Sequence, residues 1–378
     1  MFAWLTRWFG GSAESSAPEG ASRAAARAGA GAKSGHGVQT VRATAATTKS
    51  LRRQSGEQAT AKSAASPPRK PVEAYSEVLA RELGEPFMLT SADEQRTSEL
   101  VEGVSRYVAT HKIDPPVMPA IASRMLELLR EDEVDVVALA RLIEKDQATS
   151  AKLMSIANSA MFKGTKEIEG VRDAIVFLGT EQVAHIAIGL ATRAMFESPK
   201  HQTKVVGAER WNRLFHHAMT TAFAACNIAS RRNRRHSEPA FVGGLFHDAG
   251  KAVALRALTE VLAEKHQPAP SEPVIDAVLQ LIHSEPTAAL YESWSLPRQV
   301  MMMCQNHHQL SVDGTPELHV VRLVSGLDTL RAGSAVDKRD VLQEIAESCA
   351  ALRMTDAELR VAHTETKEYG ERVLKMFA

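Results

Sequence analysis

The sequence predicts an all-α protein, and three observations lead to that prediction. From about residue 72 onward, apolar residues recur three and four positions apart in one segment after another, which is the spacing of amphipathic helices. None of these segments shows sustained alternation of apolar and polar residues, the pattern of a half-buried strand. Prolines and glycines separate the segments, as they do at helix ends. We therefore expect helices throughout residues 72–378.

Residues 1–71 have a different composition and are expected to form a disordered basic tail. Residues 11–70 carry ten Lys and Arg against three Asp and Glu, with almost no large apolar side chain. Such a segment cannot bury enough surface to offset the entropy lost on ordering. Its aromatic start, Met1–Gly10, is either a short interfacial or partner-binding helix or a start peptide without a role. No aromatic residues are interleaved with the basic ones, so we expect a solvated tether and no nucleic-acid binding.

The remaining composition is that of a soluble globular protein. Hydrophobic residues make up 44% and charged residues 24% of the chain. No run of about 18 apolar residues exists, so no membrane span is expected. The cysteines Cys226, Cys304 and Cys349 are too far apart for a disulfide framework or a CxxC metal site, and they fit a reducing compartment. We expect a cytoplasmic protein.

One or two lead-in helices are expected within residues 72–110. Their apolar positions lie between Tyr75 and Leu83 and again between Leu100 and Val108. The segment Asp114–Pro119 then interrupts the helical pattern, because proline disfavours helix at its own position and at the one before it.

Five helices are expected after that break. Asp135 can cap the second of them, and Asp146 or Thr149 the third, since short polar side chains accept hydrogen bonds from the first free N–H groups of a helix. A glycine, Gly164, ends the third. Their apolar faces span Ile121–Leu129, Val136–Ile143, Leu153–Ala157, Val171–Leu178 and Val183–Leu190.

A long helix is expected over Trp211–Ala229, where many small residues would let a neighbouring helix approach closely. The basic run Arg231–His236 that follows it is interpreted as a solvated loop. Beyond residue 270, helices are expected over Ile275–Trp294, as a pair broken near Pro286, over Val300–His308, over Leu318–Leu330, and as two closing helices in residues 331–378.

The stretch Phe241–Leu255 carries the residues of greatest chemical interest. His247 and Asp248 stand between two apolar runs, although charged residues are seldom buried without a partner. Lys251, one helical turn past His247, could contact a phosphate oxygen. The alternative is a purely structural role for the His-Asp pair, as a capping and hydrogen-bond arrangement at a helix end.

Further histidines fall on apolar helix faces in the same half of the chain: His217, His283, His307 and His308. A metal site assembled from packed helices needs this pattern, with one ligand from each of several elements far apart in sequence. A single histidine on an apolar face is otherwise a core residue whose ring is satisfied by hydrogen bonds. Both interpretations stay open for each position.

Residues Phe246–Lys251, read Phe-His-Asp-Ala-Gly-Lys, resemble the signature of the HD superfamily of helical phosphohydrolases. The HDOD branch of that superfamily is similar over about residues 111–330. The similar motifs are Pro115–Ala122, Leu142–Asp146, Lys152–Phe162, Val171–Gly179, Trp294–Pro297 and His307-His308. The resemblance implies a compact helical bundle over residues 111–330, of a kind found in bacterial signalling proteins, with the helices of 331–378 packed on it. Most members of the branch look like degenerate hydrolases that act as interaction or scaffold modules.

The resemblance also implies roles for single residues. His217 matches the first metal ligand of the superfamily, and His247 and Asp248 match the pair that gives it its name. His283 and His307 or His308 match the further histidines of two-metal relatives. Ser325 stands in the place of a late aspartate ligand, and Asp328 lies about one turn further along, which weakens a Mg or Mn site most.

The paired histidines are followed by Gln309, where the related HD-GYP phosphodiesterases have a glutamate and then a Gly-Tyr-Pro motif. Hydrolysis of a cyclic dinucleotide is therefore disfavoured. Binding of a nucleotide without turnover remains open, because histidine and basic groups can still hold a phosphate.

Two hypotheses follow. The first is a cytoplasmic bacterial signal-transduction protein that acts as a non-catalytic HDOD interaction or scaffold module, with signalling proteins as partners or a nucleotide as ligand. The second is a metal-dependent phosphohydrolase or phosphodiesterase. It would use a divalent ion (Mn, Fe, Zn or Mg) held by the candidate residues, with Lys251 on the phosphate. The candidate ligands are His217, His247, Asp248, His283, His307 and His308.

Overall fold

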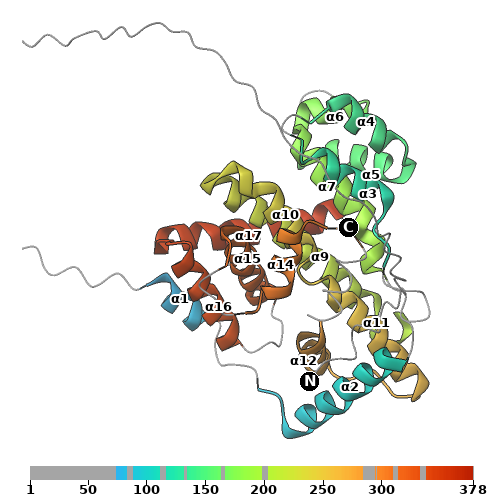
Figure 1. The fold of residues 1–378 in the computed structure, drawn as a ribbon, viewed down its shortest axis with the longest axis vertical. Coiled ribbons are helices and arrows are strands. Elements are labelled where there is room, and N and C mark those ends of the chain that lie inside the picture. The colour runs from blue at the N-terminus through green and yellow to red at the C-terminus, as the bar shows by residue number, and fades with distance from the viewer. Residues whose placement is uncertain are drawn as a thin grey trace, which may run out of the picture. The chain divides into compact units, whose positions relative to one another are not determined.

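The computed structural model describes residues 74–82, 88–110, 116–131, 134–162, 167–197, 203–283, 294, 296–309, 314–332 and 338–377. Every regular element in these ranges is helical, so the all-α prediction is confirmed (Figure 1). None of the described helices is both long and apolar enough to cross a membrane. The predicted tail over residues 1–71, with its aromatic start, lies outside the described residues.

The helices follow one another along the chain with short connections. Their bounds are α1 Tyr75–Glu82, α2 Ser91–Thr110, α3 Ala120–Leu128, α4 Val136–Glu144, α5 Gln147–Ala157, α6 Val171–Leu178, α7 Thr180–Thr192, η2 Arg193–Phe196, α8 Thr203–Val206, α9 Ala208–Arg232, η3 Arg234–His236, α10 Ser237–Phe246, α11 Ala249–Glu264, α12 Glu272–Ile282, α14 Arg298–Asn306, α15 Pro316–Ala332, α16 Lys338–Ala351 and α17 Asp356–Phe377. Of the second helix predicted to reach Trp294, only that residue is described.

Two of the predicted caps are present. The Asp135 carboxylate accepts hydrogen bonds from the backbone N–H groups of Val137 and Ala138, at 2.8 and 3.1 Å, at the start of α4. At the start of α5 the cap is Asp146, which accepts from the backbone N–H of Thr149 at 3.1 Å. The alternative of Thr149 as the capping residue is therefore wrong.

Helix α5 ends earlier than predicted, at Ala157 and not near Gly164, which lies outside the described residues. The reason is Asn158, which leaves the helix and bonds to a later segment. Its amide donates to the Ile168 carbonyl and accepts from the Ile168 N–H, both at 2.9 Å. These two bonds pair both the N–H and the carbonyl of Ile168, and they hold the segment before α6 against the end of α5.

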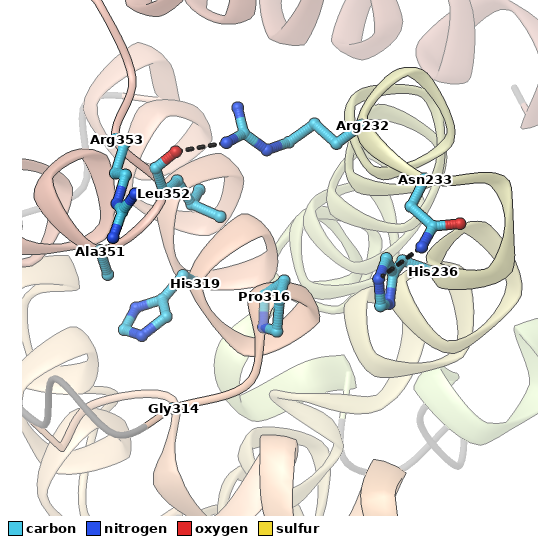
Figure 2. A pocket seen from close by; sticks show the side chains of 9 residues that line it. All are labelled: Arg232, Asn233, His236, Gly314, Pro316, His319, Ala351, Leu352 and Arg353. Carbon is cyan, nitrogen blue, oxygen red and sulfur yellow. Dashed lines mark hydrogen bonds between the residues drawn. The ribbon is translucent and has the colours of Figure 1, made fainter.

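The basic run Arg231–His236 is exposed over most of its length, as expected, but it is helical and not a loop. Arg231 lies in the last turn of α9 and pairs with Glu365 of α17. Arg232 donates to the Leu352 carbonyl after α16, as Figure 2 shows. Arg232, Asn233 and His236 also line a cavity of about 330 Å³. Arg231 and Arg232 have these partners because a carboxylate of α17 and a carbonyl after α16 lie beside this end of α9. The local sequence could not indicate these contacts.

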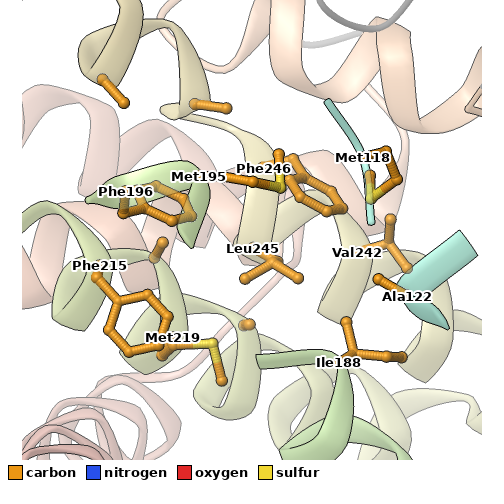
Figure 3. Close-up of a cluster of buried hydrophobic side chains, with 14 of the residues drawn as sticks. Met118, Ala122, Ile188, Met195, Phe196, Phe215, Met219, Val242, Leu245 and Phe246 are labelled. Carbon is orange, nitrogen blue, oxygen red and sulfur yellow. The ribbon is translucent and has the colours of Figure 1, made fainter. Parts of the chain in front are cut away.

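Helix α9 is the centre of the packing and contacts α10, α15 and α17. Its small residues allow a close approach, as predicted. A Cβ atom built on Gly244 of α10 would lie 2.7 Å from the Cα of Ala222, so the two backbones meet directly. Figure 3 shows part of the core that results, to which Leu245 and Phe246 of α10 and Phe215 and Met219 of α9 all belong.

Two distant segments are tied to this core. The indole N–H of Trp294 donates to the Pro116 carbonyl at 2.8 Å, which joins two of the motifs noted in the sequence. At the other end of the chain, the fully buried ring of Phe377 packs edge-to-face on Phe215, with ring centroids 5.4 Å apart. The close of α17 is therefore part of the core around α9.

Candidate metal centre

His247 and Asp248 lie at the junction of two buried helices. Helix α10 ends at Phe246 with His247 as its C-cap, and α11 begins with Asp248 as its N-cap. The Asp248 side chain makes no capping hydrogen bond, so the capping interpretation of the pair does not describe this carboxylate. Both side chains are buried, at 0% and 5% exposure, and they face histidines from other helices.

The two oxygens of Asp248 face different groups of imidazoles. Oδ2 lies 3.4 Å from His247 Nε2 and 3.5 Å from His217 Nε2. Oδ1 lies 3.5 Å from His283 Nε2 and 3.3 Å from His307 Nε2. Asp248 is thus common to two sets of potential ligands.

His308 belongs to the second set by distance. All six candidate ligands therefore converge, from α9, from the α10–α11 junction and from the ends of α12 and α14. We call His217, His247, Asp248, His283, His307 and His308 the histidine cluster.

Three of the rings are held by the ends of their own helices. His247, His283 and His307 are the C-cap residues of α10, α12 and α14. The last carbonyls of a helix lack an intrahelical partner, and each ring bonds to one of them. A carbonyl can only accept, so Nδ1 carries the hydrogen and Nε2 is left as an acceptor. The Nδ1 bonds are those of His247 to Gly244 (2.8 Å), His283 to Gln280 (3.0 Å) and His307 to Cys304 (2.6 Å).

The other two rings are held by carboxylates. His217 Nδ1 lies 2.7 Å from Asp328 Oδ2, and His308 Nδ1 lies 2.9 Å from Glu344 Oε1. A carboxylate behind an imidazole raises the basicity of the ring and orients its other nitrogen, as it does behind metal-bound histidines. The direction in which each ring points is therefore set by groups outside the cluster.

The inward nitrogens face one another at short range. His217 Nε2 lies 3.3 Å from His247 Nε2, and His283 Nε2 lies 3.5 Å from His307 Nε2. Two imidazoles that both donate through Nδ1 oppose lone pairs at these contacts, which is unfavourable unless a cation or a proton lies between them. The donor set of four such nitrogens around one carboxylate fits a divalent metal ion.

The ionisation of the cluster also suits metal ligands. Burial lowers the pKa of His247 and of His283 well below the ordinary histidine value, and it lowers the pKa of His308 to about 2. Burial by itself would raise the pKa of Asp248, but the Lys251 ammonium beside it acts in the opposite direction, and that pKa lies well below its usual range. Neutral imidazole and ionised carboxylate are the forms that bind a metal.

Ser325 occupies the inner position on α15. Its hydroxyl oxygen lies 3.1 Å from His247 Nε2 and 3.3 Å from His217 Nε2. Asp328, one turn later, orients His217 from behind and accepts a second bond from Arg331 Nε at 2.8 Å. A neutral hydroxyl therefore faces the cluster where a carboxylate would have added a negative charge.

Lys251 lies at the edge of the cluster and is ion-paired. Its ammonium donates to Asp248 Oδ2 at 2.7 Å, and its side chain keeps 18% exposure. Lys251 could contact a phosphate either while it keeps this ion pair with Asp248 or after the ion pair breaks.

Two residues at the cluster were missed in the sequence. The Gln280 amide lies 3.2 Å from His308 Nε2 and can donate to it, so this ring is held at both of its nitrogens. Glu344 of α16 orients the same ring, and burial raises the pKa of its carboxyl. Neither residue stands in a recognisable motif, because α12 and α16 both have the pattern of ordinary amphipathic helices.

The family model of the HDOD domain matches residues 116–310, slightly more than half of the chain. This protein belongs to the HDOD domain family. The match ends before α15 and α16, so Ser325, Asp328 and Glu344 lie outside it.

Relatives of this chain give the fold and no established activity. An uncharacterized protein of Treponema pallidum (strain Nichols) is 26% identical over 205 residues, 51% of this chain and 38% of that protein. A crystal structure of an HDOD domain protein of unknown function from Geobacter sulfurreducens has a TM-score of 0.54 at 18% identity, covering 74% of this chain and 98% of the other. A protein of Marinobacter aquaeolei VT8, named provisionally for signal transduction, has a TM-score of 0.53 at 20% identity over 78% of this chain and 67% of its own.

Proposed function

We propose that this HDOD protein is a bacterial signalling module that binds a divalent metal at the histidine cluster and uses the loaded site to hold a phosphorylated ligand without turnover. The observation that carries the proposal is the convergence of inward Nε2 atoms on the two oxygens of Asp248. Neutral imidazoles facing one another around a buried carboxylate are readily explained as ligands and poorly as core residues.

The candidate ligands form two groups around Asp248. His217 and His247, with one oxygen of Asp248, form one half of the site, and His283 and His307 with the other oxygen form the second. The C-termini of α10, α12 and α14 meet there, and the partial negative charge of a helix C-terminus favours a cation. A bound divalent ion would polarise a phosphoryl oxygen and lower the pKa of bound water.

Absence of turnover is proposed because the site has little negative charge and because its polar side chains are engaged by other residues. Ser325 is neutral, Lys251 is engaged by Asp248, and His308 accepts from Gln280. A hard cation prefers more carboxylate than this cluster provides. The site would therefore retain a ligand through positive charge and would lack a group positioned as a general base.

An exposed apolar pair supports a role as an interaction module. Val176 and Phe177 of α6 are 82% and 49% exposed, although large apolar side chains are usually at least partly covered. Signalling proteins are the class of partner proposed for this pair.

The first experiment is elemental analysis of the full chain purified without chelator. We expect near-stoichiometric Mn, Fe or Zn at the histidine cluster of the wild-type protein and the loss of that equivalent of metal in His247→Ala. His216→Ala is the matched control, because His216 neighbours His217 on α9 but is not among the converging ligand groups. A histidine cluster without metal in the folded wild-type protein, even after dialysis against each ion, would refute the proposal.

A specific observation favours hydrolysis as the second candidate function. Asp248 faces one histidine pair with each oxygen, an arrangement that could bridge two ions, and two-metal sites stabilise both the attacking and the leaving oxygen of a phosphate ester. Metal-loaded protein should be incubated with bis-(p-nitrophenyl) phosphate. Turnover that disappears in Asp248→Asn and persists in His216→Ala would replace the non-catalytic proposal with this one.

A further inference from the structure

A second group of potential metal ligands lies outside the histidine cluster. Glu181 and His185 of α7 and Cys226 of α9 each offer one ligand atom, and these atoms lie within 4.8 Å of one another. Glu181 and His185 are four positions apart, so one face of α7 presents both. The Cys226 sulfur lies 3.8 Å from Glu181 Oε1.

The His185 ring is buried, and one of its nitrogens has no hydrogen-bond partner. The residue is 3% exposed, and its Nε2 makes no hydrogen bond. The ring stacks on Phe241 at a centroid distance of 3.7 Å and meets Phe223 edge-on at 6.2 Å. A buried polar atom without a partner is costly, and two aromatic rings hold this one in a defined orientation. A ligand that accepts its lone pair would remove the cost.

The protonation states distinguish a metal site from a reactive thiol. Burial lowers the pKa of His185 to about 3, so the ring is neutral and can act as a ligand. Burial, together with the Glu181 carboxylate, raises the pKa of the Cys226 thiol, so the sulfur is not a nucleophilic thiolate in the protein alone. A bound cation would release the thiol proton and bring the sulfur into the anionic form.

We propose that Glu181, His185 and Cys226 form a zinc site that is separate from the histidine cluster. Thiolate, imidazole and carboxylate in one group are the ligand types of zinc, which is usually four-coordinate in proteins. Three protein ligands leave one position for water. The ion would join α7 to α9, and this inference does not depend on the function proposed for the histidine cluster.

Cobalt(II) is the appropriate probe, because sulfur ligands give cobalt an intense charge-transfer absorption in the near ultraviolet that imidazole and carboxylate ligands do not. The histidine cluster contains no cysteine, so its cobalt would not contribute. Full-length protein freed of metal should be titrated with cobalt. We expect the band in the wild type and in Cys304→Ser, a control at another buried cysteine, with a final intensity that corresponds to one sulfur-bound cobalt per chain after both sites are filled.

Cys226→Ser should lose the band. His185→Phe, which keeps an aromatic ring beside Phe241, should lower cobalt affinity on the order of tenfold or more, since changes merely behind a ligand already cost that much. Absence of the band from saturated wild-type protein, or its persistence in folded Cys226→Ser, would overturn the proposal.

A second measurement covers the case in which Cys226→Ser does not fold. X-ray absorption at the zinc edge on zinc-loaded Cys304→Ser should show a sulfur neighbour at about 2.3 Å. A shell of nitrogen and oxygen alone would contradict the site, whichever variants prove stable.

Discussion

At the scale of single residues, the histidine cluster depends on which ring nitrogen points inward. His247, His283 and His307 have this choice made by helix-end carbonyls that would otherwise lack partners. For His217 it is made by Asp328, the carboxylate that lies one turn beyond Ser325 on α15. The carbonyls at the ends of α10, α12 and α14 therefore orient the histidine that each of these helices contributes to the cluster.

Ser325→Asp should strengthen metal binding. The new carboxylate would stand where a hydroxyl now lies 3.1 Å from His247 Nε2 and 3.3 Å from His217 Nε2, and added negative charge favours hard cations most. We expect manganese affinity to rise about 10- to 100-fold, the scale on which changes around a metal site act. Isothermal titration calorimetry measures this, with Ser325→Ala as the control that should show no gain. An unchanged affinity in folded Ser325→Asp would count against a metal at this position.

At the scale of elements, close backbone contact determines where α10 lies. Gly244 leaves no room for a side chain, because its Cβ would meet the backbone of Ala222 at 2.7 Å. Gly243, its neighbour, faces the flexible end of Met303 at 3.0 Å. The two glycines thus look equivalent in the sequence and differ in what they contact.

Gly244→Ala should destabilise the protein by about 1–3 kcal/mol, since two helices would have to move apart. Gly243→Ala is the matched control and should change the free energy of unfolding by less than about 1 kcal/mol, because Met303 can shift and alanine favours helix. Urea denaturation of both variants measures the difference. Equal destabilisation would show that the α9–α10 contact does not have the closeness described.

The junction between α5 and α6 depends on one side chain. Asn158→Ala removes both hydrogen bonds to Ile168, each of 2.9 Å, and should lower the free energy of unfolding by about 1–3 kcal/mol. Ser155→Ala, at an exposed position of α5, is the control and should be close to neutral. A thermal melt that shifts equally in the two variants would remove the structural role assigned to Asn158.

At the scale of the whole molecule, residues beyond the family match complete the candidate site. Ser325 and Asp328 of α15 and Glu344 of α16 contact cluster histidines, although the match ends at residue 310. Helix α17 in turn packs on α9, and its last described residue, Phe377, is buried against Phe215. The C-terminal helices are therefore part of the environment that would hold a metal.

Metal should stabilise the whole fold, because an ion held by residues from several helices binds the folded chain and not the unfolded one. At a free metal concentration 100 times the dissociation constant, the gain is about 2.7 kcal/mol. Thermal melts of the full chain with added manganese, and again with chelator, test this. Asp248→Asn should lose most of the gain, and equal gains in both proteins would place the bound ion elsewhere.

The sequence by itself determined the helices and the family. Apolar spacing predicted α3 to α7 and the C-terminal helices, and Asp135 and Asp146 marked two starts, because these signals act within a few residues. The resemblance around His247 and Asp248 led to the HDOD family, which the family match confirms.

Only the tertiary structure decided what those helices bring together. It places Glu344 behind His308, the charges at the end of α9 on the C-terminal helices, and Cys226 beside Glu181. These contacts join residues far apart in sequence, so no local pattern contains them. The sequence could name candidate ligands, but ring orientation, burial and partner distance arise only when the helices pack.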